Sequence, residues 1–76
     1  MINFESRLAE LRRGKCLTQK ELGEILRVGE RTVRYYEGGG RKPDFDGLVA
    51  MADFFGVSLD YLVGRTDDSK LHQLGD

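Results

Sequence analysis

The sequence contains little of what metal binding, covalent cross-linking or catalysis requires. Its 76 residues include one cysteine, Cys16, and one histidine, His72. A single cysteine excludes an intramolecular disulfide, and one Cys with one His cannot supply the ligands of a structural zinc site. We therefore interpret Cys16 as a packed core thiol and expect no catalytic residue, no metal and no cofactor.

Long apolar runs are also missing. No stretch approaches the ~18 apolar residues of a membrane span. Residues 1–4 are soon followed by Glu5 and Arg7, which is unlike a signal peptide. We expect a cytoplasmic protein with no membrane contact. At 76 residues the chain forms one small domain, which favours compact helices or a partner subunit.

The glycine-rich stretch does not fit a nucleotide site. A P-loop needs G-x-x-x-x-G-K-[ST] between a strand and a helix, because its amides surround the phosphates. Here the three glycines at 38–40 follow a predicted helix, and the basic pair at 41–42 is followed by Pro43. No βαβ unit supports a dinucleotide fingerprint either. The sequence predicts no enzyme and no small-molecule ligand.

Charge is divided unevenly along the chain. Residues 7–42 hold ten Lys or Arg and five Glu, a balance of +5. Residues 43–76 hold seven Asp against Arg65 and Lys70, a balance of −5, and Glu5 completes the net charge of −1. This segregation favours a basic face for an acidic partner, although two ordinary solvated faces would give the same counts.

Hydrophobic periodicity and cap residues predict helices only, so the expected fold class is all-α. The expected helices cover about 4–14, 19–27, 30–37, 45–55 and 59–63. Caps set most of these limits: Thr18 with Glu21 makes a capping box, and Asp44 and Ser58 are N-caps. The apolar stripes predict a core from Phe4, Leu8, Leu11, Leu17, Leu22, Ile25, Leu26, Val33, Tyr36, Leu48, Met51, Ala52, Phe55, Leu59 and Leu62.

The third expected helix separates its residues by face. At 3.6 residues per turn, the inner face holds Thr32, Val33 and Tyr36. The outer face is polar and holds Glu30, Arg31, Arg34 and Tyr35. Two short helices joined by a tight turn, the second with a polar outer face, form a helix-turn-helix that can enter a DNA major groove.

These features resemble the phage Cro and repressor type of helix-turn-helix domain, the XRE family. The resemblance lies in "LTQKELGEILRVGERTVRYYEGGGRKP" (17–43) and "ADFFGVSLDYLVGR" (52–65). It covers residues 4–65 and implies a five-helix repressor-like bundle with its helix-turn-helix at about 18–37. Residues 66–76 are expected to form a short polar tail.

The resemblance also implies roles for single residues. It places Glu30, Arg31, Arg34 and Tyr35 against base edges, where Arg can bridge guanine and Glu can accept from cytosine. A solvated helix face is the alternative for these four. It implies contacts with the DNA backbone for Thr18, Gln19, Arg27, Arg41 and Lys42. Arg12 and Glu37 match a pair that forms a structural salt bridge between the first and third helices of relatives.

Two positions depart from the family pattern. Arg27 occupies a turn position that is usually glycine, where a left-handed backbone would cost ~1–2 kcal/mol. Gly29 replaces the usual Ser or Thr cap of the third helix and is a weaker cap.

The expected function is that of a sequence-specific regulator of transcription that binds double-stranded DNA. We expect a repressor that binds a palindromic operator as a homodimer. The alternative is a protein-interaction module, such as an antitoxin or antirepressor, that uses the acidic C-terminal half. Phe45, Phe54 and Tyr61 either close the edge of the core or form the dimer contact.

Overall fold

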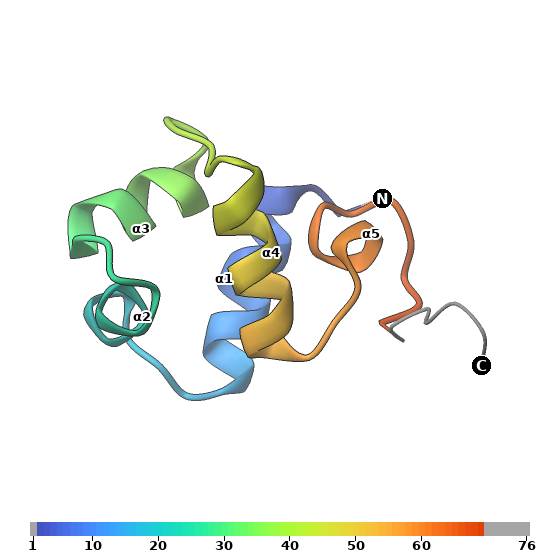
Figure 1. The fold of residues 1–76 in the computed structure, drawn as a ribbon, viewed down its shortest axis with the longest axis horizontal. Coiled ribbons are helices and arrows are strands. Elements are labelled where there is room, and N and C mark those ends of the chain that lie inside the picture. The colour runs from blue at the N-terminus through green and yellow to red at the C-terminus, as the bar shows by residue number, and fades with distance from the viewer. Residues whose placement is uncertain (1, 70–76) are drawn as a thin grey trace.

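All five expected helices are present in the computed structural model, which describes residues 2–69 (Figure 1). The helices are α1 (Phe4–Gly14), α2 (Gln19–Leu26), α3 (Glu30–Gly38), α4 (Phe45–Phe55) and α5 (Leu59–Leu62). Within residues 2–69 there is no strand, so the all-α prediction is confirmed. His72 and most of the expected polar tail lie outside the described residues.

Two helices connect the ends of the molecule. In Figure 1, α1 and α4 occupy the middle, α2 and α3 lie at one end, and α5 lies at the other. Helix α1 contacts both α3 and α5, while α2 packs against α3 and α4. The pair α2–α3 is therefore held from behind by α1 and α4, and its outer side is exposed.

Side-chain caps begin four of the five helices. Asn3, Thr18, Asp44 and Ser58 each accept a hydrogen bond from the backbone amide three residues later. The predicted caps Thr18, Asp44 and Ser58 are confirmed. Helix α3 begins after Gly29 with no side-chain cap, as that residue predicts.

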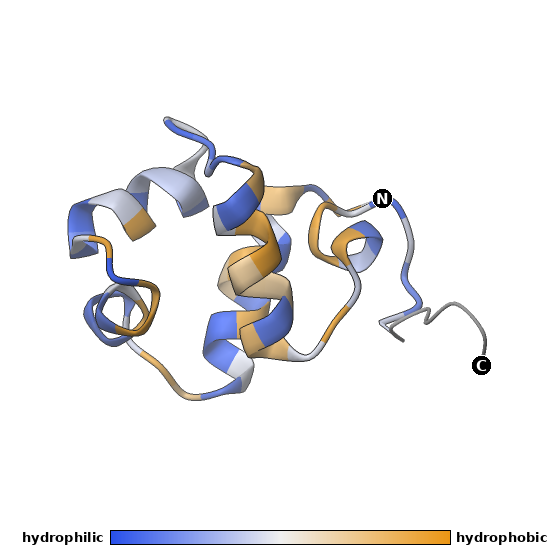
Figure 2. Ribbon diagram, viewed as in Figure 1, coloured by the Kyte–Doolittle hydropathy of each residue, from blue (hydrophilic) through white to orange (hydrophobic). Residues whose placement is uncertain are grey.

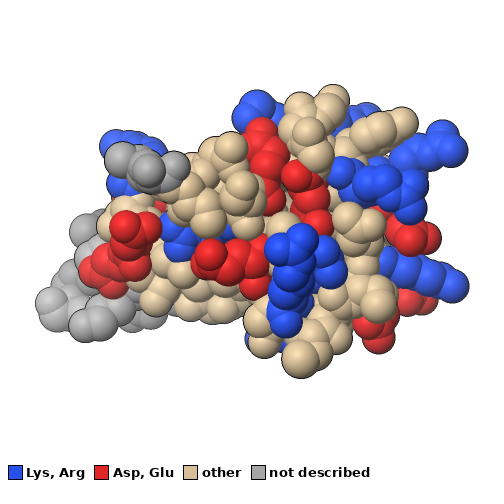
Figure 3. Space-filling model, turned by 180° about the vertical axis from the view of Figure 1, so that it is seen from behind, with Lys and Arg blue, Asp and Glu red and all other residues tan. Residues whose placement is uncertain are grey.

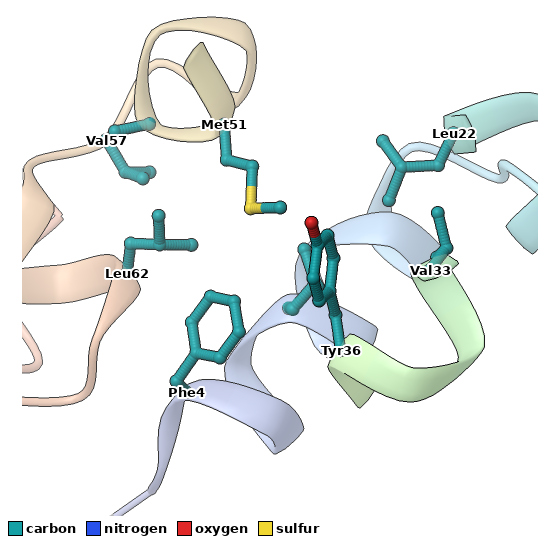
Figure 4. Packing of buried hydrophobic residues seen from close by; sticks show 9 residues of the cluster. Phe4, Leu22, Val33, Tyr36, Met51, Val57 and Leu62 are labelled. Atoms are coloured by element: carbon teal, nitrogen blue, oxygen red, sulfur yellow. The ribbon is translucent and has the colours of Figure 1, made fainter. Parts of the chain in front are cut away.

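The core gathers side chains from all five helices. Figure 2 shows α4 mostly in hydrophobic colours and α3 mostly in pale or hydrophilic colours. In Figure 4 the Tyr36 ring lies between Phe4 and Met51 on one side and Leu22 and Val33 on the other. The inner face predicted for α3 is confirmed, because Val33 is 0% exposed and Tyr36 is 9% exposed.

Two of the apolar residues that were predicted to join the core lie at the surface. Ile25 is 44% exposed, because α2 faces the core with Leu22 and Leu26 and leaves Ile25 at its edge. Leu59 is 36% exposed, because it begins the short helix α5 and only the end of that helix is buried.

The interpretation of Cys16 as a core thiol is wrong. Cys16 is exposed, and it lies in the turn after α1 with φ 58°. The next residue, Leu17, packs against the core instead.

Gly64 joins the end of α5 to the start of the chain. It is buried with φ 86°, and a Cβ atom here would meet the backbone oxygen of Ile2. Gly56, the cap of α4, has a similar φ of 68°, but a Cβ atom at this position would have nothing within 4 Å. The two glycines share a backbone conformation and differ in the space around them.

Replacing each glycine by alanine separates the cost of the left-handed backbone from the cost of a steric clash with Ile2. Gly56→Ala should cost about 1 kcal/mol, which is the cost of a left-handed alanine. Gly64→Ala should cost clearly more, since the N-terminal backbone must also move. Urea denaturation of both variants measures the difference, and equal losses would contradict the close approach of Ile2.

Candidate nucleic-acid interface

Helix α2 begins with the reciprocal bonds of a capping box. The Glu21 amide donates to Thr18 Oγ1 over 3.0 Å, and the Thr18 amide donates to Glu21 Oε1 over 2.8 Å. The bond from the Thr18 amide, followed by a hydrogen bond from the Thr18 side chain, holds the pKa of Glu21 below its ordinary 4.5. The stabilisation they give is present above that ordinary value and is lost as pH falls through the lowered pKa.

The turn between α2 and α3 depends on close backbone packing. The Val28 amide donates to the Gly23 carbonyl over 2.8 Å. A Cβ atom on Gly23 would lie 2.9 Å from the Val28 oxygen, so a side chain there would push the two helices apart. Arg27 ends α2 in the left-handed conformation, with φ 60° and ψ 40°. The left-handed turn predicted at Arg27 is therefore present.

The outer face of α3 is solvent-exposed along its length. Glu30, Arg31, Arg34 and Tyr35 are all exposed, and Tyr35 is 45% exposed. Arg34 Nη2 donates to Glu30 Oε2 over 3.4 Å, which joins two of the four side chains. The Tyr35 ring lies against the Gly40 backbone, since a Cβ on that glycine would be 3.4 Å from the ring.

An ion pair holds the C-terminal end of α3 against α1. Arg12 donates from Nε and Nη2 to the two Glu37 oxygens over 2.7 and 3.0 Å, so the predicted pair is present. Arg12 Nη1 also donates to the Leu17 carbonyl over 2.9 Å. Gln19 Nε2 donates to Glu37 Oε1 over 3.2 Å. We call these four residues, Arg12, Leu17, Gln19 and Glu37, the Arg12–Glu37 hub; it connects α1, α2 and α3.

Arg12 keeps its charge within the hub. The hydrogen bond to Glu37 raises the pKa of Arg12, and burial opposes this without cancelling it. The hub also gives Gln19 a partner within the protein, which the sequence did not predict.

The glycine loop (residues 38–40) at the end of α3 leads to Arg41 and Lys42, two of the residues predicted to contact the DNA backbone. Gly39 caps α3 with φ 85°, and Arg41 and Lys42 beyond it are exposed. Lys42 Nζ lies 3.6 Å from Glu5 Oε1, so an acid from α1 faces the loop. This contact between the loop and α1 was not predicted either.

Basic side chains extend from the end of the molecule that carries α2 and α3. Figure 3 shows them at the right, with acidic side chains between them. The exposed charges on these helices and their turn include Lys20, Arg27, Arg31 and Arg34 and the acids Glu21, Glu24 and Glu30. The bases therefore outnumber the acids on these two helices and their turn, although the charges are mixed in sign. An excess of positive charge attracts an anionic partner.

A second charged cluster lies at the other end. Arg7 is 3% exposed, and its guanidinium lies 3.7 Å from the centre of the Tyr61 ring. It also donates to Asp67 over 3.1 Å. Nothing in the sequence predicted this burial. Arg7 is a charged residue beside the apolar stripe of α1, and no sequence pattern distinguishes it from an exposed arginine. Tyr61 therefore contributes to the edge of the core.

Metal and membrane features are absent from the part of the chain that the structure describes. Among residues 2–69 no group of three or more His, Cys, Asp or Glu side chains is placed to hold a metal ion. No helix in the same range is long and apolar enough to cross a bilayer.

The left-handed turn gives a stability test. Arg27→Gly should raise the free energy of unfolding by up to about 1 kcal/mol, because glycine adopts this conformation without steric strain. Cys16→Gly is a matched control, since Cys16 has φ 58° but lies outside the helix-turn-helix. Chemical denaturation measures both. A loss of stability in Arg27→Gly alone would mean that the Arg27 side chain makes stabilising contacts.

Comparisons with known proteins place this geometry in a family. A family model described as Helix-turn-helix matches residues 8–62. The HTH-type transcriptional regulator ImmR of Bacillus subtilis (strain 168) is 39% identical over 72 residues, which is 95% of this chain and 57% of ImmR. The cryptic phage CTXphi transcriptional repressor RstR of Vibrio cholerae is 32% identical over 71 residues, covering 90% of this chain and 64% of RstR. The chain thus spans little more than half of ImmR.

Solved structures share the fold. A transcriptional regulator from Listeria innocua superposes with a TM-score of 0.78 and 34% identity, covering 96% of this chain and 64% of that one. The P22 c2 repressor, solved with a synthetic operator, superposes with a TM-score of 0.77 over 83% of this chain and 96% of its own, at 22% identity. Its similarity supports the fold alone. With the match over residues 8–62 and these relatives, the chain belongs to the XRE type of the helix-turn-helix family.

Proposed function

We propose that this chain is a transcriptional regulator that binds double-stranded DNA with α3 in the major groove. The observation that supports this most is the division of α3 into a buried inner face and an exposed polar outer face. The outer face offers two arginines and none of the aliphatic anchors with which a helix binds in the groove of a partner protein. Base contacts are assigned to Glu30, Arg31, Arg34 and Tyr35.

Backbone contacts are proposed on both sides of α3. Thr18 and Gln19 lie at the start of α2, where the first amides of a helix suit phosphate oxygens. Arg27, in the turn, and Arg41 and Lys42, after the glycine loop, are exposed cations beside the same face. Such contacts position a protein on DNA and leave sequence selection to the base contacts.

The names of the relatives support regulation of transcription. ImmR is a transcriptional regulator, and RstR is a phage repressor. We infer that this chain acts as a repressor by occupying a promoter in the bacterial cytoplasm or nucleoid.

We further propose that the regulator binds a palindromic operator as a homodimer. Phe45 at the start of α4 is 68% exposed, the largest exposure among the large apolar side chains of residues 2–69. Leu59 at the start of α5 adds a second exposed apolar side chain. Both residues lie outside α2 and α3, so a second copy bound there leaves the outer face of α3 free for DNA.

A protein-interaction module is the second candidate, and one feature favours it. Between α4 and α5 a hollow of about 350 Å³ has an apolar lining that includes Val57 and Leu59, and Asp53 and Asp60 also line it. A basic peptide with apolar side chains would suit this hollow. Selection of duplexes from a random pool, followed by gel shift, separates the two functions, because only the DNA-binding protein enriches a sequence.

Substitutions should separate base contacts from backbone contacts. Arg34→Ala should weaken binding to the selected operator by ~1–3 kcal/mol and relax the preference at one base pair of each half-site. Lys42→Ala should weaken all duplexes alike and lower the slope of log affinity against log salt by about one unit. Titrations on operator variants at several salt concentrations measure both effects.

Arg65→Ala is the control for these titrations. Arg65 is an exposed cation that pairs with Asp60 over 3.7 Å near α5, at the end opposite α3. Arg65→Ala removes the same charge as the other two substitutions. It should leave the base preference unchanged and alter the salt slope only slightly, through long-range electrostatics. If Arg34→Ala weakened every duplex alike, Arg34 would be a phosphate contact and the proposed placement of α3 would be wrong.

The dimer predicts a two-part footprint. Hydroxyl-radical footprinting on the selected operator should show two protected segments on one face of the duplex. Their centres should lie about one helical turn, ~10 base pairs, apart. A single short footprint with one chain per duplex would contradict the dimer and leave DNA binding intact.

A further inference from the structure

Two opposite charges on the outer face of α3 are already joined to each other. Glu30 and Arg34 are one helical turn apart, and Arg34 Nη2 lies 3.4 Å from Glu30 Oε2. Their side chains are 47% and 59% exposed, so both remain accessible to a ligand. The Arg31 side chain on the same face makes no ion pair or hydrogen bond within residues 2–69. It therefore provides an internal comparison for the paired Arg34.

In water this contact contributes little, because exposed helix pairs four residues apart are screened. In a major groove the situation changes. A carboxylate that enters the groove approaches the phosphates of both strands, and it loses hydration unless a donor replaces the water. Glu30 therefore fits the groove only with Arg34 beside it and a base donor in front of it.

We propose that Glu30 and Arg34 bind base edges as one unit, and that each operator half-site carries two adjacent G·C base pairs, one presenting its cytosine to Glu30 and the other its guanine to Arg34. This inference rests on the proposed function and names the sequence that α3 selects.

The hydrogen-bonding capacities of the two side chains favour this dinucleotide. Arg34 has five N–H donors and uses one on Glu30, so a fork remains for guanine O6 and N7. Glu30 has a second oxygen, which can accept from cytosine N4. Adenine also offers an amino group, but its neighbouring N7 acceptor would face the carboxylate and repel it.

The same pair explains how a mixed-sign face discriminates between sequences. On unselected DNA, Glu30 finds no suitable donor, repels the phosphates and keeps Arg34 from contacting them. Glu30 thus weakens non-specific binding while it supports specific binding. On unselected DNA, an arginine without a carboxylate partner, such as Arg31, is attracted to the phosphates and carries no such penalty.

A double-mutant cycle on the full chain tests the coupling. Duplexes are first selected by the wild-type chain from a random pool. The affinities of Glu30→Ala, Arg34→Ala and the double variant are then measured on the selected duplex and on a scrambled duplex. The matched control is a second cycle that pairs Glu30→Ala with Arg31→Ala. Circular dichroism confirms that the helical content of each variant is unchanged.

The unit predicts a specific pattern. Arg34→Ala lowers affinity for the selected duplex about tenfold or more, and the double variant is hardly weaker than Arg34→Ala alone. On the scrambled duplex, Glu30→Ala binds more tightly than wild type, and its salt slope is steeper by about one unit. The Arg31 cycle is additive.

Two results would overturn the inference while leaving the proposed function standing. One is a selected sequence whose half-sites lack two adjacent G·C base pairs. The other is a pair of losses that simply add in the Glu30–Arg34 cycle. Failure of the wild-type chain to enrich any sequence would overturn the proposed function and this inference together.

Discussion

Arg12 and Glu37 are opposite charges that the fold removes almost completely from water, with 12% and 8% of their side chains exposed. Neither charge is tolerable there alone, because breaking a buried pair costs about 3–5 kcal/mol. A core of this size supplies only about that much stability. Since the pair also holds Leu17 and Gln19, the angle between α1, α2 and α3 depends on one carboxylate and one guanidinium.

The outer face of α3 is a consequence of that arrangement. Val33 and Tyr36 lie in the core, the Arg12–Glu37 hub holds the last turn, and Gly23 lets the first turn approach α2 closely. With these points fixed, the α3 helix has one orientation relative to α2. A small domain can therefore present a rigid polar surface without a large core behind it.

Much of this was predictable because it is local. Thr18 and Glu21 cap α2 within four residues, and the 3.6-residue period of α3 separates Val33 from Arg34 without reference to the rest of the fold. The failures involve tertiary contacts or a turn. Ile25 has the spacing of a core residue but lies at the edge of α2, and Cys16 is exposed in the left-handed turn after α1.

Three side-chain pairs could not be predicted from the sequence, because they too depend on tertiary contacts. Gln19 with Glu37, Lys42 with Glu5 and Arg7 with Asp67 are separated by 18, 37 and 60 residues, so no periodicity brings them together. The charge halves were visible in composition. Which acids and bases share a surface was not, because that depends on which side chains the fold leaves exposed together.

Binding of DNA by the outer face of α3 and the segments beside it is tested most directly by NMR. Chemical shifts of the backbone amides are followed while the chain is titrated with its selected duplex. We expect the largest shifts at the amides of 18–19, along α3 and at 41–42, with smaller shifts in α5, where the proposed dimer contact lies. Shifts concentrated instead on Asp53, Leu59 and Asp60, with α3 unaffected, would contradict this placement of the DNA.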